Sequence, residues 1–226
     1  MMYQGNNSFL SSIPPVVKNI IIVNIIIYIA TMLSGNFMYN KFALFYFSSP
    51  FFKPYQIITH MFMHGGFFHI FFNMYTLFIF GSVLERVWDS KKFLFYYFVT
   101  GIGAALLHLG VMWLQINGAM DAANAGDPTA IAKIQEILLT PTVGASGAIY
   151  GLLLAYGMLF PNNVMQLFFP PVALKAKYFV LIFGALELFL GISGRGGNIA
   201  HFAHLGGMLF GFFLILYWKK NNKMYY

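Results

Sequence analysis

The chain has 226 residues, of which 59% are hydrophobic and only 8% are charged, and its formal net charge is +7. Soluble domains carry about 25% charged residues, so this composition excludes an ordinary soluble protein and indicates an integral protein of the lipid bilayer. The basic residues are scattered singly at the ends of apolar runs, which excludes a nucleic-acid-binding face and favours a role in membrane topology.

Apolar segments long enough to cross about 30 Å of hydrocarbon recur along the whole chain. They predict an all-α, polytopic bundle of six transmembrane helices in one membrane domain, residues 1–226, with a core at about 17–218. The residues before the first segment lack the basic region of a cleaved signal, so we expect a retained signal-anchor helix. The six segments are Val17–Leu33, Phe67–Trp88, Phe93–Leu114, Gly147–Phe160, Tyr178–Ile192 and Ile199–Trp218.

Two connections on the outer side are long. The connection from Gly35 to Gly66 is rich in aromatic residues and is expected to lie in the membrane interface, partly as helix. The connection from Gln115 to Thr142 is the only strongly polar stretch of the chain.

The basic residues assort between the two sides of the membrane. If the N-terminus is cytoplasmic, most of them fall on the inner side, as the positive-inside rule requires, and the sixth span returns the C-terminus to the cytoplasm. The inner residues are Lys18, Arg86, Lys91, Lys92, Lys175, Lys177, Lys219, Lys220 and Lys223, and the outer ones are Lys41, Lys53, Lys133 and Arg195.

Four polar residues are predicted to lie at a similar depth below the outer surface. His69 and Asn73 are near the start of the second span, Ser146 is at the start of the fourth, and His204 is near the start of the sixth. The fourth span is short, so its outer end must be sunk beside a wet cavity or within protein. A polar residue at this depth in the membrane is costly and therefore suggests a functional site, although interhelical hydrogen bonding is the common alternative.

Small residues recur every fourth position on the fourth and sixth spans. Such ridges let two helix backbones approach closely, so the serine hydroxyl and an imidazole of the facing helix could share a hydrogen bond. The ridges are Gly147, Gly151 and Ala155 on the fourth span, and Ala203, Gly207 and Gly211 on the sixth.

The polar residues predicted at one depth suit nucleophilic catalysis, which needs a nucleophile, a base and hydrogen-bond donors to an oxyanion. Ser146 and His204 supply the first two. The amide of Ser146 at a helix N-terminus, together with His69 and Asn73 on one face of the second span, supplies the donors. Cysteine is absent, so a cysteine nucleophile is excluded.

No acidic residue is predicted to orient His204. Glu85 and Asp89 fall on the cytoplasmic side and Glu187 lies in the fifth span, so we expect a serine–histidine dyad without an acidic third member. The other polar residues are expected to be structural: His201 as a structural or cavity-lining residue, His60 and His64 as loop anchors, and His108 and Glu187 as packing residues.

Three motifs resemble those of the rhomboid family of intramembrane serine proteases, in the expected order and on the expected helices. They are "HMFMHGGFFHIFFN" (His60 to Asn73), "GASGAIYG" (Gly144 to Gly151) and "AHLGGMLFG" (Ala203 to Gly211), and the resemblance covers roughly Pro54 to Trp218. It implies the six-helix rhomboid core, with the fifth helix and the loop after it as a lateral substrate gate.

The resemblance also implies an activity and its residues. Ser146 would be the nucleophile, His204 the general base, and His69 and Asn73 oxyanion residues. The supporting residues would be Gly144 in the serine loop, Gly147, and Tyr150 stacked on the base. The substrates would be transmembrane proteins, with no cofactor and no metal, and the location would be the bacterial inner membrane.

Other interpretations stay open at this point. Ser146 could serve only as a helix cap and His204 only as a hydrogen-bonding residue between helices. A zinc protease pattern is missing, because no glutamate follows His60 in "HMFMH". The alternatives to the protease are a catalytically silent rhomboid-like protein that binds membrane proteins, and a haem protein with paired histidine ligands.

Overall fold

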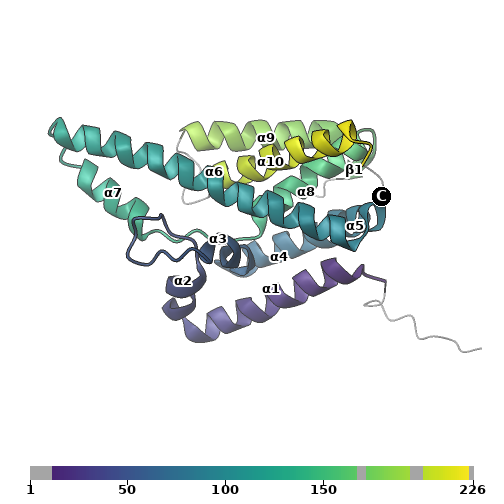
Figure 1. The fold of residues 1–226 in the computed structure, drawn as a ribbon, viewed down its shortest axis with the longest axis horizontal. Coiled ribbons are helices and arrows are strands. Elements are labelled where there is room, and N and C mark those ends of the chain that lie inside the picture. Colours follow the sequence, from purple (N-terminus) through teal and green to yellow (C-terminus); the bar gives the residue numbers. More distant parts are fainter. Residues whose placement is uncertain (1–11, 167–171, 194–200, 224–226) are drawn as a thin grey trace, which may run out of the picture.

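A computed structural model describes residues 12–166, 172–193 and 201–223 of the chain. These residues form a bundle of apolar helices with one small β-hairpin (Figure 1). The elements are α1 (Pro15–Ser34), α2 (Asn36–Phe42), α3 (Gln56–Thr59), the 3₁₀ turn η2 (His60–Phe62), α4 (Phe67–Thr76), the π-helical turn η3 (Leu77–Gly81), α5 (Ser82–Trp88), α6 (Ser90–Asn124), α7 (Ala130–Leu139), α8 (Ser146–Leu159), β1 (Val164–Gln166), β2 (Ala173–Lys175), α9 (Ala176–Ser193) and α10 (His201–Lys220).

The predicted all-α polytopic membrane architecture is confirmed. Among the residues that the structure describes, five segments are long and apolar enough to cross a membrane: α1, the continuous α4–η3–α5 segment, α6, α9 and α10. The apolar helix α8 has only 14 residues, which corresponds to about 21 Å of rise. A count of six spans therefore stays a prediction, because it requires that α8 cross with one end sunk below the surface. Ile199 and Ala200, with which the sixth predicted span begins, lie outside the described residues.

The bundle has two distinct ends. The start of α1, the turn between α5 and α6, the β-hairpin and the end of α10 lie together at one end, and α2, α3 and α7 lie at the other (Figure 1). The first end carries most of the residues predicted to be cytoplasmic. Glu85 of α5 links α1 and α6 at this end of the bundle. The Glu85 carboxylate accepts hydrogen bonds from the backbone N–H groups of Val16 and Val17 and from the hydroxyl of Ser90.

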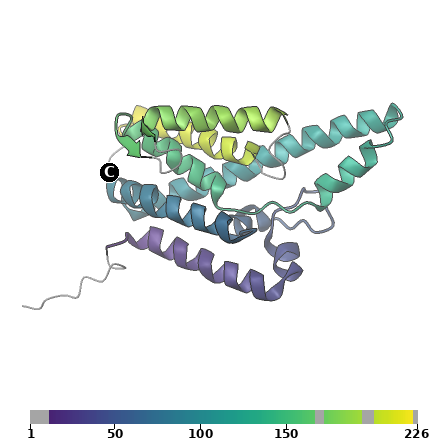
Figure 2. The ribbon, with the colours of Figure 1, turned by 180° about the vertical axis from the view of Figure 1, so that it is seen from behind.

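Helix α6 is longer than predicted. The sequence predicted a span ending at Leu114, but the helix continues through the polar stretch to Asn124, turns at Gly126 and is followed by α7. Alanine favours helix here, and Met112 and Ile116 of α6 pack against the loop that follows α2. The α6–α7 pair consequently projects beyond the rest of the bundle (Figure 2).

The prediction of partly helical structure between Gly35 and Gly66 is confirmed by α2, α3 and η2. The segment that joins α2 to α3 is tied down by Gln56, which is fully buried. Its side-chain NH₂ donates to the carbonyls of Lys41 and Phe51, and its side-chain oxygen accepts from the N–H of Lys53. A single glutamine thus fixes the conformation of this loop.

Glycines bring α6, α8 and α10 into close contact. A Cβ atom at Gly147 would lie 2.4 Å from that of Ala104 on α6, and one at Gly207 would lie 1.8 Å from the carbonyl oxygen of Gly147. A Cβ atom at Gly151 would meet Thr100, also on α6, at 2.6 Å. The small-residue ridges therefore pack α8 not only against α10, as predicted, but also against α6.

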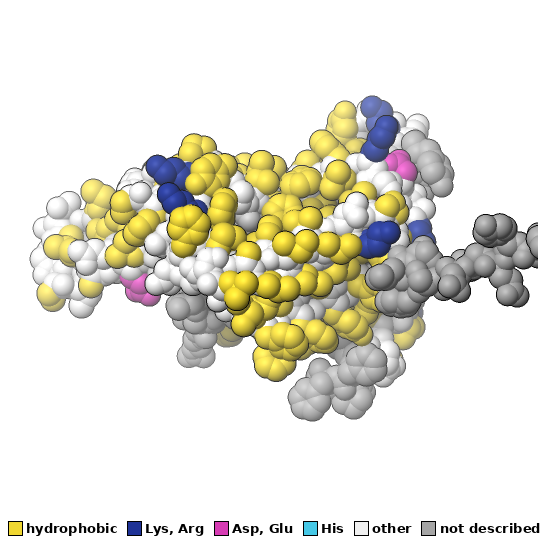
Figure 3. All heavy atoms as spheres, turned by 90° about the horizontal axis from the view of Figure 1, so that it is seen from below, with side chains coloured by type: hydrophobic (Ala, Val, Ile, Leu, Met, Phe, Trp, Pro, Cys, Tyr) yellow, Lys and Arg dark blue, Asp and Glu magenta, His cyan; other side chains and the backbone are white. Residues whose placement is uncertain are grey.

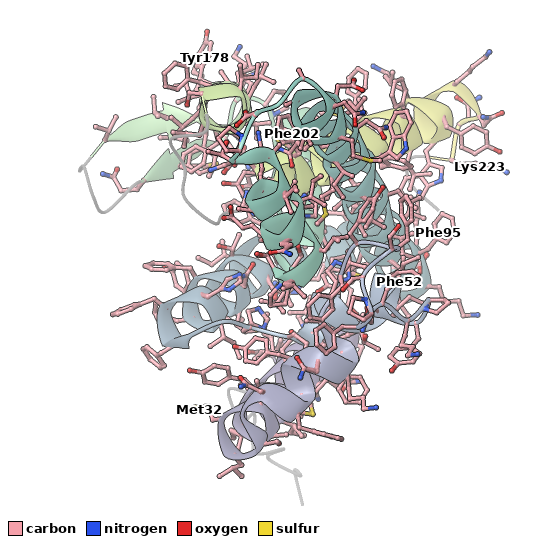
Figure 4. The ribbon with its side chains drawn as sticks, turned by 90° about the vertical axis from the view of Figure 1, so that its left-hand side faces the viewer. Met32, Phe52, Phe95, Tyr178, Phe202 and Lys223 are labelled. Atoms are coloured by element: carbon pink, nitrogen blue, oxygen red, sulfur yellow. The ribbon has the colours of Figure 1, made fainter. Side chains whose placement is uncertain are left out.

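The outer surface of the bundle suits a lipid environment. Hydrophobic side chains cover much of the face seen in Figure 3. Met32 of α1 and Tyr178 of α9 point away from the bundle (Figure 4) and are 69% and 50% exposed. Because few polar groups interrupt these faces, hydrocarbon can solvate them. The chain is an integral membrane protein.

Candidate active site

The loop before α8 is anchored on three sides. The backbones of Thr142 and Leu44 exchange two hydrogen bonds, of 2.8 and 2.9 Å. The N–H of Gly144 donates to the carbonyl of His60 at 2.9 Å, and Nε2 of His108 lies 2.9 Å from the hydroxyl of Thr142. Gly144 has a φ of 133°, which favours glycine. The start of α8 is thus held in a defined position, and both histidines contribute to holding it.

Ser146 and His204 are hydrogen-bonded across two helices. Ser146 is the first residue of α8, His204 is in the first turn of α10, and Oγ of the serine lies 2.8 Å from Nε2 of the histidine. The ring of Tyr150, one turn along α8, stacks on the imidazole with a centroid distance of 4.2 Å and an interplanar angle of 5°. The imidazole is therefore fixed both in its plane and at its Nε2 atom.

Glu187 lies beside this pair, so the prediction that no acidic residue is near His204 is wrong. Oε2 of Glu187 is 3.0 Å from Nδ1 of His204 and 2.6 Å from Nδ1 of His201. Its other oxygen accepts a hydrogen bond from the hydroxyl of Tyr150. The position of Glu187 along the fifth span does not predict this contact, because the contact depends on which face of α9 turns toward α8 and α10.

His69 approaches the serine from α4. A Cβ atom placed on Gly144 would lie 2.8 Å from Nε2 of His69 and 3.4 Å from Oγ of Ser146, so the two side chains flank the same point above Gly144. Nδ1 of His69 accepts from the N–H of Gly65 at 3.3 Å, which leaves the proton of a neutral ring on Nε2. His69 thus presents an N–H donor toward the space beside Ser146.

Asn73 is buried one turn further along α4. Its side-chain NH₂ donates one hydrogen bond, of 2.8 Å, to the carbonyl of His69. An amide NH₂ group carries two hydrogens, so one remains for another acceptor. Asn73 therefore both supports the backbone that carries His69 and keeps a donor of its own.

Two further histidines support the site in different ways. The imidazole of His60 lies with Nδ1 2.9 Å from the carbonyl of Gln56, and burial lowers its pKa to about 4. Burial lowers the pKa of His64 to about 3, and its ring packs edge-on against His69 at a centroid distance of 5.0 Å. Both rings are neutral at physiological pH, so they add no positive charge beside His69.

A small cavity and a cluster of potential metal ligands lie beside the serine–histidine pair. A cavity of ≈ 10 Å³ lined by Ser146, Gly144 and His60, among others, is near the lower limit for one water molecule. Glu187, His201 and His204 are the one group of described residues whose potential ligand atoms converge, all within 4.8 Å of one another. In this structure those atoms face each other and Ser146 as hydrogen-bond partners.

Comparison with known proteins places the chain in a family. A model of the Rhomboid domain matches residues 51–221, which is most of the chain and includes every residue of the site. The chain belongs to the Rhomboid family. The resemblance seen in the three sequence motifs is thereby confirmed. The lateral gate that it implies stays a prediction, and residues 194–200, which follow α9, lie outside the described residues.

Rhomboid relatives include proteins named as proteases. The chain is 29% identical to the putative rhomboid protease YdcA of Bacillus subtilis over 75% of its own length and 70% of that protein. It is 28% identical to the rhomboid protease AarA of Providencia stuartii, over 67% of the chain and 51% of AarA. It is 29% identical to the mitochondrial Rhomboid protein 1 of Saccharomyces cerevisiae, over 69% of the chain but only 39% of the yeast protein.

Proposed function

We propose that the chain is an intramembrane serine endopeptidase that cleaves transmembrane segments of other membrane proteins. The observation that carries this proposal is the 2.8 Å hydrogen bond between Ser146 and His204 within a Rhomboid-family membrane protein. A serine hydroxyl is a weak nucleophile unless an adjacent base takes its proton. The pair has the separation that general-base catalysis requires.

The reaction follows from this geometry. Oγ of Ser146 attacks the scissile carbonyl while its proton passes to Nε2 of His204, and the oxyanion forms beside the N-terminus of α8. Donors to the oxyanion are the backbone N–H of Ser146, Nε2–H of His69 and the amide of Asn73. His204 then gives the proton to the leaving amine, and water attacks the acyl-enzyme with His204 again as base. No cofactor or metal takes part in these steps.

The arrangement in the membrane is proposed with the activity. Residues 1–226 form one rhomboid membrane domain with six spans, and both termini lie in the cytoplasm of a bacterium. Lys18 of α1, Arg86 of α5 and Lys219 of α10 belong to elements whose ends meet at one end of the bundle (Figure 1), which supports this orientation. The active site then lies toward the outer face.

The test is cleavage of a labelled transmembrane substrate by the detergent-purified protein, with the cut mapped by mass spectrometry. A helix hides its carbonyls in its own hydrogen bonds, so the scissile region must unwind before attack. We therefore expect substrates with glycine or proline near the cut to be cleaved faster than uniformly leucine-rich helices. Equal rates for the two kinds of substrate would contradict this requirement.

The other interpretations give different results in the same experiment. A catalytically silent rhomboid-like binding protein would retain the substrate and leave it intact. A haem protein would show the strong absorbance bands of haem after purification, and we expect none. Adding a metal chelator is expected to leave cleavage unchanged, whereas a metal-dependent protease would lose activity.

The oxyanion donors can be tested individually. Removal of one oxyanion donor costs on the order of 10²- to 10³-fold in rate, so Asn73→Ala and His69→Ala are each expected to slow cleavage by about this factor. The fall should appear in kcat, because the donors bind charge that develops only in the transition state. The measurement is steady-state cleavage of the labelled substrate by each folded variant.

Asn24 on α1 offers a matched control. It is fully buried and, like Asn73, donates from its side chain to the carbonyl four residues earlier, at 2.7 Å. Asn24→Ala removes the same kind of hydrogen bond far from Ser146, so it should lower thermal stability with little change in kcat. Wild-type kcat in Asn73→Ala and His69→Ala would remove both side chains from the oxyanion site and leave only backbone donors.

A further inference from the structure

A buried carboxylate lies in the middle of the site. Glu187 is 7% exposed on α9, and a carboxylate in such a position is costly unless its oxygens are paired. One oxygen accepts from the hydroxyl of Tyr150, and the other faces the Nδ1 atoms of His201 and His204. These partners all lie within or beside the serine–histidine pair. The position of the carboxylate therefore suggests a role in the chemistry of that pair.

The hydrogen bond between Nε2 of His204 and Ser146 determines which nitrogen of the imidazole must carry the hydrogen. For Nε2 to accept the serine proton, the neutral ring must carry its own hydrogen on Nδ1. Oε2 of Glu187 is the acceptor that faces this atom, at 3.0 Å. The ring N–H does not point straight at the oxygen, and such contacts in resting active sites commonly tighten in the transition state.

We propose that Glu187 is the positioning residue for His204, so that the chain uses a Ser146–His204–Glu187 arrangement in place of a dyad. The carboxylate selects the Nδ1–H tautomer of His204 and stabilises the imidazolium that forms when the ring takes the serine proton. The inference rests on the proposed protease function. It assigns to α9 a direct part in the chemistry, because nucleophile, base and carboxylate come from three different helices.

The competing explanation is that Glu187 serves only to hold His201. That contact is shorter, at 2.6 Å, and well aligned. Among the described residues of α9 beyond Val180, Glu187 is the only buried one, so a purely structural link between α9 and α10 would also account for its burial. The two explanations differ in what happens when His201 is removed.

The experiment compares labelling of Ser146 by a fluorophosphonate probe in the full-length protein and its variants. Glu187→Gln keeps the shape of the side chain and an acceptor for Tyr150 but removes the charge. Replacing the acid of a serine-protease triad by its amide costs about 10⁴-fold in kcat in chymotrypsin-type enzymes, so we expect labelling to slow by at least about 10²-fold. Glu187→Asp keeps the charge and should recover part of the rate.

His201→Ala is the matched control. It removes the other imidazole from Glu187 and frees the carboxylate for His204, so labelling should stay within a few-fold of wild type. If His201→Ala slows labelling as much as Glu187→Gln, the carboxylate acts through His201 and the proposal is overturned. If Glu187→Gln labels at the wild-type rate, Glu187 has no part in positioning the base.

A spectroscopic measurement does not depend on a Glu187 variant folding. In protein with ¹⁵N-labelled histidine, the signal of His204 is assigned by its loss in His204→Ala. We expect its Nδ1 to be protonated and its N–H proton to be shifted far downfield by the carboxylate. A neutral His204 protonated on Nε2 would contradict the proposal. Wild-type protein that no phosphonate labels would instead count against the protease function itself, so the two failures are distinguishable.

Discussion

Ser146→Ala is expected to abolish labelling by a fluorophosphonate, and His204→Ala to reduce it nearly to background. The probe reacts with a serine whose proton is taken by an adjacent base, and the 2.8 Å contact from Oγ to Nε2 places that base. Loss of nucleophile or base in a serine protease costs about 10⁶-fold in kcat. Labelling is measured by in-gel fluorescence, and the modified residue is identified by mass spectrometry.

The chain contains its own controls for this result. Among the described residues the hydroxyl of Ser82 has no hydrogen-bond partner, that of Ser90 donates to Glu85 and that of Ser193 donates to the carbonyl of Leu190, so we expect these serines to remain unlabelled. His201→Ala should retain labelling, since the ring of His201 faces Glu187 and not Ser146. The choice of base would be reversed if His201→Ala abolished labelling and His204→Ala spared it.

Gly207→Ala is expected to disrupt the contact between α8 and α10 and to abolish labelling of Ser146. The added Cβ would lie 1.8 Å from the carbonyl oxygen of Gly147, and this is a backbone atom that no side-chain rotation can move. The helices must separate, and Ser146 precedes Gly147 directly. Overpacking costs about 1–3 kcal/mol and occasionally more, and a backbone clash belongs at or above the upper end. Thermal unfolding in detergent measures the loss.

Gly110→Ala on α6 is the matched control for that substitution. An added Cβ there meets no atom within 4 Å, so the change keeps the packing and replaces a poor helix former by a good one. Its stability should equal or exceed that of wild type, by up to about 1 kcal/mol. Gly207→Ala with wild-type stability and labelling would show that the close approach of α8 and α10 is not needed.

The membrane-spanning helices could be predicted from sequence because span length is a local property of apolar runs. The extension of α6 could not, since the residues after Leu114 are polar while the helix is sustained by contacts of Met112 and Ile116 with the loop after α2. The hairpin of β1 and β2 was also missed. Its strands have three residues each, which is too short for an alternating pattern to be recognised.

The contacts of the site that depend on the depth of a residue in the membrane could be predicted from the sequence. The contacts that depend on the rotation of a helix about its axis could not. Ser146 and His204 were predicted at the same depth and lie next to residues of the small-residue ridges, so their contact could be expected from the order of the spans. The contact of Glu187 with His204 depends on the rotation of α9 about its axis, which spacing does not reveal. One signal was present, because an acidic residue inside an apolar span needs a nearby partner.

The burial pattern of α9 has a consequence for the order of events in a reaction. Beyond Val180 the buried residue of this helix is Glu187, whose carboxylate contacts His201 and His204 of α10, while Leu181, Phe189 and other side chains face outward. If Glu187 positions His204, as proposed, a segment that entered between α9 and the bundle would first separate the carboxylate from His204. Under that proposal hydrolysis would begin only after α9 had returned to its place, so the residence time of a bound helix, as well as its sequence, would decide whether it is cut.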